Sequence, residues 1–146
     1  MTNIKTLFTI LLLSLLYGCN LKEKKEDRTF YRAINGKDTA LLSLSINKNR
    51  FYGQYEIIYG KMGKDSGDVR GEIIGDSLRG VYNYISYGGS WKKAPIAFLK
   101  KDNTLLLGSG VAGTLLGMPI YLPEFPVDYN NSAFVFKEIN KSVEKE

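Results

Sequence analysis

The stretch Asp68–Tyr87, DVRGEIIGDSLRGVYNYISY, decides the fold class. On both sides of Gly75-Asp76, apolar residues and glycines recur at every second position, as in a strand with one buried face. A Gly-Asp pair between two such runs favours a two-residue hairpin turn whose first residue, glycine, has a positive φ angle. The stretch therefore predicts two antiparallel strands, Asp68–Ile74 and Ser77–Tyr87.

The same period of two extends outward in both directions from this hairpin. Turn residues separate the runs, and the polar, glycine-rich segment Gly60–Gly67 predicts a loop. The other predicted strands are Phe30–Ile34, Ala40–Ile46, Arg50–Tyr59, Trp91–Leu99, Thr104–Leu107 and Ala133–Ile139. About eight strands with mostly short connections predict an all-β fold, built as an antiparallel meander.

Three of these strands carry a glycine in the middle, at Gly53, Gly71 and Gly80. Glycine weakens a strand unless the sheet bends or packs closely there, so the repeated glycines indicate a coiled sheet. A coiled meander of eight strands closes, or partly closes, into a barrel and so removes its exposed edges. In strand number and spacing, Phe30–Ile139 resembles the lipocalin and avidin-like barrels, and this resemblance implies a ligand in the barrel interior.

Composition bears on several classes of function. The 146 residues suit one domain, and the formal net charge of +5 is spread along the chain with acidic residues between the basic ones. Because the basic residues form no concentrated stripe, we expect no nucleic-acid binding.

The chain has no histidine and one cysteine, which leaves neither an internal disulfide nor a zinc site of Cys and His ligands. We expect no cofactor and no metal site.

The amino terminus has the layout of a secretory signal. Lys5 precedes the apolar run Leu7–Tyr17, which is shorter than the roughly 20 residues that a membrane-spanning helix needs. The motif Leu16-Tyr17-Gly18-Cys19 resembles the lipobox of bacterial lipoproteins. This resemblance implies cleavage before Cys19, acyl chains on Cys19 and a location in the cell envelope.

The resemblance divides the chain into four parts. These are a signal peptide (1–18), the lipidated cysteine with a flexible tether (19–28), one barrel domain (29–140) and a polar tail (141–146). The tether alternates in charge and has almost nothing apolar to bury, which is typical of a spacer, although it also resembles the export signals of some surface lipoproteins. Asn20 is not the Asp of inner-membrane retention signals, so we expect the outer membrane and leave its face open.

Catalytic motifs are weak in this sequence. Gly108–Gly113 matches the dinucleotide-binding fingerprint in letters, but Gly117 and Pro119 would stop the helix that holds the pyrophosphate, so a loop is expected. There is no Gly-x-Ser-x-Gly elbow and no histidine base. Two carboxylates such as Glu56 and Glu72 could still meet in the fold. We expect that the protein is not an enzyme.

Two regions are candidates for contact with a ligand or a partner. Gly108–Asn131 is apolar, carries three of the four prolines and is predicted to be a long loop that plugs one end of the barrel, covers a cavity as a lid or forms an exposed patch. The middle strands are rich in tyrosine, which suits both a core and a ligand-binding wall. The candidate contact residues are Tyr55, Tyr82, Tyr84, Trp91, Leu116, Met118, Tyr121 and Phe125.

Two functions remain open at this point. The first is non-enzymatic binding of a small apolar or amphiphilic ligand inside a membrane-anchored barrel. The alternative is an envelope interaction factor or inhibitor that acts through its loops and has a solid core. The barrel interior separates the two, because ligand binding needs a cavity lined by the strand aromatics.

Overall fold

The computed structural model describes residues 27–140, a range that contains strands and turns but no helix, hence no helix that could span a membrane. The strands of this range are β1 (Arg28–Asn35), β2 (Asp38–Asn47), β3 (Arg50–Tyr59), β4 (Gly63–Ile74), β5 (Ser77–Ile85), β6 (Trp91–Lys101), β7 (Thr104–Leu107), β8 (Ala112–Leu115), β9 (Met118–Tyr121) and β10 (Val135–Ile139). Apart from β4, β8 and β9, each agrees with a predicted strand to within two residues at either end.

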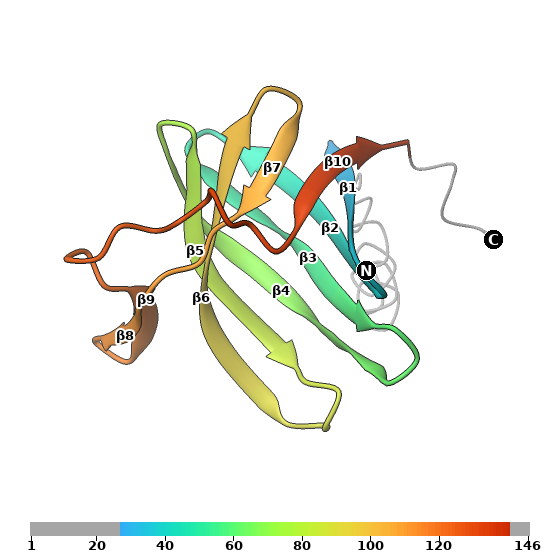
Figure 1. The fold of residues 1–146 in the computed structure, drawn as a ribbon. Coiled ribbons are helices and arrows are strands. Elements are labelled where there is room, and N and C mark those ends of the chain that lie inside the picture. Colours follow the sequence, from blue (N-terminus) through green and yellow to red (C-terminus); the bar gives the residue numbers. More distant parts are fainter. Residues whose placement is uncertain (1–26, 141–146) are drawn as a thin grey trace, which may run out of the picture.

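Eight of these strands close into an antiparallel barrel in the order β1-β10-β7-β6-β5-β4-β3-β2. Strands β1 to β7 follow one another around the wall as a meander, and β10 closes the wall between β7 and β1 (Figure 1). The predicted all-β, eight-stranded antiparallel barrel is therefore confirmed. Because all eight strands lie within residues 27–140, a fragment that begins at Asn20 contains the whole barrel.

The hairpin that decides the fold forms with the predicted turn. β4 and β5 pair up to Ile74 and Ser77, which leaves Gly75-Asp76 as the two-residue connection. Gly75 has a φ angle of +59°, a backbone conformation that glycine adopts without a steric penalty. The mid-strand glycines serve a different purpose: Gly71 and Gly80 face each other across this hairpin, and a Cβ on either would lie 2.0 Å from a backbone carbonyl oxygen. Glycine at these two positions therefore lets the two strands approach and coil.

Aromatic side chains fill the half of the barrel near the β4–β5 and β6–β7 turns. Phe51, Tyr55, Phe98 and Phe136 are at most 2 % exposed. Tyr55 and Phe98 meet edge to face at a centroid distance of 6.1 Å, and Phe98 and Phe136 do so at 5.8 Å. Edge-to-face contacts of this kind add to the stabilisation from burial. This half of the barrel has a packed core.

The predicted loop Gly60–Gly67 is wrong in its second half. The connection is only Gly60–Met62, and β4 begins at Gly63 and pairs with β3 from Tyr59 onward. The polar residues of this part of β4 bond across the ladder: the Ser66 hydroxyl donates to Glu56 Oε1 at 2.7 Å. Because polar side chains here pair across the strands by hydrogen bonds, this part of β4 lacks the alternation of apolar and polar residues. The sequence pattern therefore did not reveal a strand.

The prediction that Gly108–Asn131 lacks regular structure is also wrong. β8 and β9 form a hairpin within it, paired from Ala112 and Tyr121 to Leu115 and Met118. The hairpin lies against the outer face of β5 and β6, so it does not plug an end of the barrel (Figure 1). The reason is that this outer face is apolar: Val81 and Ala97, which alternate with inward-facing residues, are 8 % and 0 % exposed.

Candidate functional site

The barrel wall is incomplete at one end. β7 and β10 have four and five residues, against 12 in β4 and 11 in β6. β6 pairs with β7 only over Phe98–Lys101, and the first half of β6 extends past the end of β7 (Figure 1). The turns Gly36-Lys37, Gly60–Met62 and Ser86–Ser90 surround this end, which we call the open end; we call the opposite end the far end.

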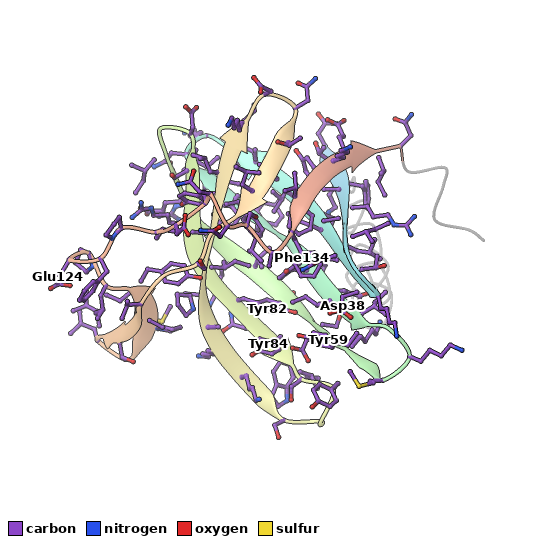
Figure 2. All side chains as sticks on the ribbon, viewed as in Figure 1. Asp38, Tyr59, Tyr82, Tyr84, Glu124 and Phe134 are labelled. Atoms are coloured by element: carbon purple, nitrogen blue, oxygen red, sulfur yellow. The ribbon has the colours of Figure 1, made fainter. Side chains whose placement is uncertain are left out.

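Tyrosine rings line the inside of the open end. Tyr82 and Tyr84 on β5 are stacked, with centroids 4.3 Å apart and planes 8° from parallel. Tyr59 on β3 meets Tyr87 edge to face at 5.9 Å. Figure 2 shows Tyr59, Tyr82 and Tyr84 gathered in this half of the molecule. Tyr82 is buried whereas Tyr59 and Tyr84 are partly exposed, so the aromatic lining runs from the core to the rim.

A buried carboxylate holds this lining in place. Asp65 projects inward from β4 and is 9 % exposed. Its Oδ2 accepts a hydrogen bond from the Tyr59 hydroxyl at 2.9 Å, and its Oδ1 accepts one from the Tyr87 backbone N–H at 2.9 Å. These bonds compensate part of the cost of burying the carboxylate. Asp65 thereby ties β3, β4 and the β5–β6 connection together and orients the Tyr59 ring.

Tyr59, Tyr82 and Tyr84 are neutral at physiological pH. Burial raises the pKa of Tyr82 above its usual value, and the neighbouring Tyr55 and Asp65 raise it further. Burial also raises the pKa of Tyr59, and the hydrogen bond to Asp65 adds to the effect. Burial, followed by the charge of Asp65, raises the pKa of Tyr84. The lining therefore offers uncharged aromatic faces and uncharged hydroxyl groups.

Lysines lie at the rim of this aromatic lining. Lys92 on β6 is the cross-strand partner of Tyr84, so both side chains lie on the inner side of the sheet, and Lys92 is exposed. A pocket at the rim is lined by Lys37, Asp38, Tyr59, Gly60, Lys61 and Met62. The open end therefore combines an aromatic inner surface with a rim of mainly positive charge.

The structure separates the predicted contact residues into three places. Tyr82 and Tyr84 lie inside the open end, as a ligand-binding wall requires. Tyr55 lies in the packed core and is 2 % exposed, and the centroid of its ring lies 4.9 Å from that of Tyr82. Tyr55 therefore lies beneath the aromatic lining of the open end and offers no surface to a ligand. Trp91 pairs with Ile85 on the outer side of the sheet and is 75 % exposed.

The remaining predicted contact residues belong to the β8–β9 hairpin or follow it. Leu116 at the hairpin tip is 96 % exposed and has a φ angle of +49°, and Gly117 has +77°. Two positive φ angles favour Asn-Gly, so leucine at the first position is strained. The other exposed large apolar side chains of this region are Val111, Leu115, Met118 and Phe125.

A groove of about 400 Å³ separates the hairpin from the barrel wall. Its lining consists of Arg79, Gly80, Val81 and Ile96 of the wall and Met118, Pro119, Ile120, Tyr121 and Pro123 of the hairpin side. Tyr121, a predicted contact residue, donates its hydroxyl to the Gly108 carbonyl oxygen at 3.3 Å and so holds the hairpin to the barrel. Apart from Arg79, this groove is uncharged.

The carboxylate pair considered for catalysis does not form. Glu56 lies opposite Ser66 and Glu72 opposite Arg50, which places them six residues apart along the β3–β4 ladder, or roughly 20 Å. Partial burial opposes ionisation of Glu56, but hydrogen bonds from Ser66 and Lys64 outweigh it and lower its pKa. Residues 27–140 contain no group of three or more His, Cys, Asp or Glu side chains placed to hold a metal ion.

Sequence reasoning missed Asp65 and Lys92 as parts of the open end. Asp65 falls in the predicted loop Gly60–Gly67, and Lys92 is not among the predicted contact residues. Tyr84 and Lys92 are cross-strand partners in the pairing of β5 with β6, and cross-strand partners share a face. With this pairing in hand, the inward position of Tyr84 would have placed Lys92 on the inner side as well. No comparable signal existed for Asp65, whose strand has no apolar alternation.

The predicted signal peptide, the lipidation site Cys19 and the tail 141–146 lie outside residues 27–140. No family model, no curated protein and no solved structure matches the chain.

Proposed function

We propose that the protein binds a small amphiphilic ligand at the open end of its barrel, without catalysis, as a lipid-anchored protein of the cell envelope. One observation carries this proposal: Tyr59 and Tyr84, which face inward at the open end, remain partly exposed above a packed core. The core half is filled by side chains, so the ligand occupies the mouth and not the full length of the barrel.

The chemistry of the mouth indicates the class of ligand. An apolar or flat body would stack on Tyr84, whose ring is supported from behind by Tyr82. The uncharged hydroxyls of the lining would tolerate polar groups along this body. Lys92, and Lys61 at the rim pocket, favour a negative headgroup. An anionic amphiphile fits both parts of the site.

Direct titration tests ligand binding. The Asn20–Glu146 fragment is titrated with dansyl-undecanoic acid and with a dansyl-labelled alkyl amine of the same chain length, and dansyl fluorescence is followed. We expect the carboxylate to bind more tightly, because its headgroup meets the lysines. Tyr84→Ala should weaken its binding about tenfold by removing the stacking surface. Phe125→Ala, an exposed aromatic of the hairpin segment, is the matched control and should have no effect.

The groove beside the hairpin provides the competing location. Ile120→Trp would fill this groove without touching the open end. Loss of binding in Ile120→Trp together with normal binding in Tyr84→Ala would place the ligand in the groove and contradict the proposal. Failure of both probes to bind at millimolar concentration would contradict ligand binding of this class altogether.

The anchoring part of the proposal is supported by the lipobox-like motif. Each buried CH₂ group contributes about 0.8 kcal/mol of membrane affinity, and one acyl chain holds only marginally, so two or three chains are needed for lasting attachment. Cys19→Ser should abolish incorporation of labelled palmitate in cells and leave the protein uncleaved at this site or released from the membrane. Asn20→Ala is the control. Wild-type labelling of Cys19→Ser would show that Cys19 is not lipidated.

Leu116 favours a second function, the binding of a protein partner through the hairpin. A fully exposed leucine in a strained backbone conformation costs stability, and such strain often marks a functional site. The only charged residues of Gly108–Asn131 are Glu124 and Asp128, so the partner would offer an apolar pocket with a basic rim. A photo-reactive leucine analogue at position 116 should cross-link to one envelope protein in cells, whereas the same analogue at Ile34 should not.

A further inference from the structure

The turns of the open end expose large apolar side chains in addition to the stacked rings of Tyr82 and Tyr84. Met62 in the β3–β4 turn is 82 % exposed. Tyr87 and Trp91 in and after the β5–β6 connection are 69 % and 75 % exposed. Trp91 is the only tryptophan of the chain, and its side chain lies mostly in water. An exposed apolar surface of this kind calls for a functional explanation.

These side chains come from adjacent turns and strand ends of the open end. Ile85 and Trp91 are cross-strand partners, so they lie side by side on the outer face. A Cβ on Gly63 would lie 2.9 Å from the Tyr87 Cβ, which shows that the start of β4 touches the β5–β6 connection. We call Met62, Ile85, Tyr87 and Trp91 the apolar rim.

Positive charge surrounds the apolar rim. The lysines in or next to the turns of the open end are Lys37, Lys61, Lys64, Lys92 and Lys93. The carboxylates of this end are less accessible than the lysines. Asp65 is buried and hydrogen-bonded inside the barrel, Glu56 is paired with Lys64 at 2.9 Å, and Asp38 lines the rim pocket and is partly buried. Because the Lys64–Glu56 pair is neutral as a whole, the excess positive charge of the open end comes from Lys37, Lys61, Lys92 and Lys93.

We propose that the open end docks on an anionic lipid bilayer, with the apolar rim at headgroup level and the lysines next to lipid phosphates. Tryptophan and tyrosine prefer the membrane–water interface because each has an apolar body and a polar tip. Lysines attract anionic lipids and can keep their ammonium groups in water while their stems lie along apolar surface. The apolar rim consists of residues in or next to turns that project separately from the barrel. A fluid bilayer adapts to such an uneven surface, whereas a folded protein partner would need a complementary shape.

Vesicle binding tests this proposal directly. The Asn20–Glu146 fragment lacks Cys19, so its binding comes from the domain and not from an attached lipid. It is mixed with vesicles of phosphatidylcholine alone or with a share of phosphatidylglycerol. Trp91 is the only tryptophan, so its emission reports on the rim itself. We expect a shift to shorter wavelength and quenching by brominated lipid with anionic vesicles only, and weaker binding at high salt.

Charge variants test the role of the lysines. The double variant Lys61→Gln/Lys92→Gln should lower affinity for anionic vesicles by about tenfold, measured by co-sedimentation. Lys100→Gln/Lys101→Gln removes the same charge at the far end and is the matched control. Equal loss in the two variants would show that net charge alone drives binding, and the docking proposal would be wrong.

Apolar variants identify the inserted residues. Trp91→Ala should weaken co-sedimentation, whereas Leu116→Ala on the hairpin should not. The opposite result, or equal binding to neutral and anionic vesicles, or no binding at all, would overturn the proposal. Tyr84→Ala should weaken ligand binding about tenfold but keep vesicle binding, so the failure of one proposal is distinguishable from the failure of the other.

Discussion

Glycine meets two different demands in this barrel, one conformational and one steric. Gly75 has a φ angle of +59°, and a Cβ there would meet nothing within 4 Å. Gly80 has an ordinary backbone conformation, but a Cβ there would lie 2.0 Å from the Arg70 carbonyl oxygen. Any side chain at Gly75 is therefore strained by its own backbone, whereas any side chain at Gly80 collides with the neighbouring strand.

Gly75→Val isolates the conformational demand. Because the site is open, the cost comes only from valine at positive φ, on the order of 1 to 3 kcal/mol. Asp76→Asn is the control and should barely change the free energy of unfolding. Both are measured by urea denaturation of the Asn20–Glu146 fragment. Negligible effects of both substitutions would contradict the turn on which the β4–β5 pairing depends.

Two tyrosine hydroxyls provide a matched pair for hydrogen bonding. The Tyr55 hydroxyl is buried and meets no partner within residues 27–140, whereas the Tyr82 hydroxyl donates to the Tyr55 carbonyl oxygen at 3.0 Å. Tyr55→Phe should leave stability unchanged or raise it by up to about 1 kcal/mol, and Tyr82→Phe should lower it by about 1 kcal/mol. Denaturation midpoints compare the two. A larger loss in Tyr55→Phe than in Tyr82→Phe would show that the Tyr55 hydroxyl has a partner.

At the scale of elements, the β8–β9 hairpin differs from the strands of the barrel. Every barrel strand has a neighbour on both sides, whereas β8 and β9 pair only with each other and rest on the wall through β9. A lone two-stranded hairpin is marginally stable in water. We therefore expect local opening of the hairpin to precede unfolding of the barrel.

Leu116→Asn tests the strain at the hairpin tip. Asparagine tolerates positive φ, so the variant should stabilise the hairpin by about 1 kcal/mol while it removes an exposed apolar side chain. Slower amide hydrogen exchange in β8 and β9, at unchanged exchange in the barrel core, is the expected result. Leu115→Asn, outside the turn, is the control. Faster exchange in Leu116→Asn would indicate that Leu116 packs on a surface in solution.

At the scale of the whole molecule, the buried tyrosines predict loss of stability in alkali. Burial raises the pKa of Tyr55, Tyr82 and Tyr121 above the usual value of 10.0. Above about pH 10 the unfolded chain releases phenol protons that the folded chain keeps, so the free energy of unfolding falls as pH rises. Each strongly buried phenol contributes at most about 1.4 kcal/mol per pH unit.

Urea denaturation between pH 7 and pH 11 measures this slope. Stability should be nearly flat up to about pH 9.5 and fall above pH 10, with tyrosinate absorbance appearing together with unfolding. Tyr55→Phe/Tyr82→Phe should make the alkaline slope shallower, because it removes two phenol groups whose pKa is raised in the folded protein. An unchanged slope in this double variant would assign the alkaline transition to other groups.

The sequence by itself determined seven of the eight barrel strands, the second half of β4, and their order along the chain. Alternation places Phe51, Tyr55 and Tyr59 on one face of β3, and Gly75-Asp76 ends one strand and begins the next. These are local properties: side-chain direction repeats every two residues, and turn residues act on their own backbone. The mid-strand glycines also signalled close packing, although not which strands approach each other.

Only the tertiary structure decided where the strands close and what remains open. The short lengths of β7 and β10 leave Tyr59 and Tyr84 accessible, and no local pattern states how far two distant strands pair. The hairpin rests on Val81 and Ala97, where both faces of β5 and β6 are apolar. A strand that is apolar on both faces shows no alternation, so the sequence did not indicate that the outer face is covered here. Asp65 joined the site through bonds to Tyr59 and Tyr87, which lie six and 22 residues away along the chain. Contacts between distant segments depend on closure of the whole barrel, and this is why the open end was visible only in three dimensions.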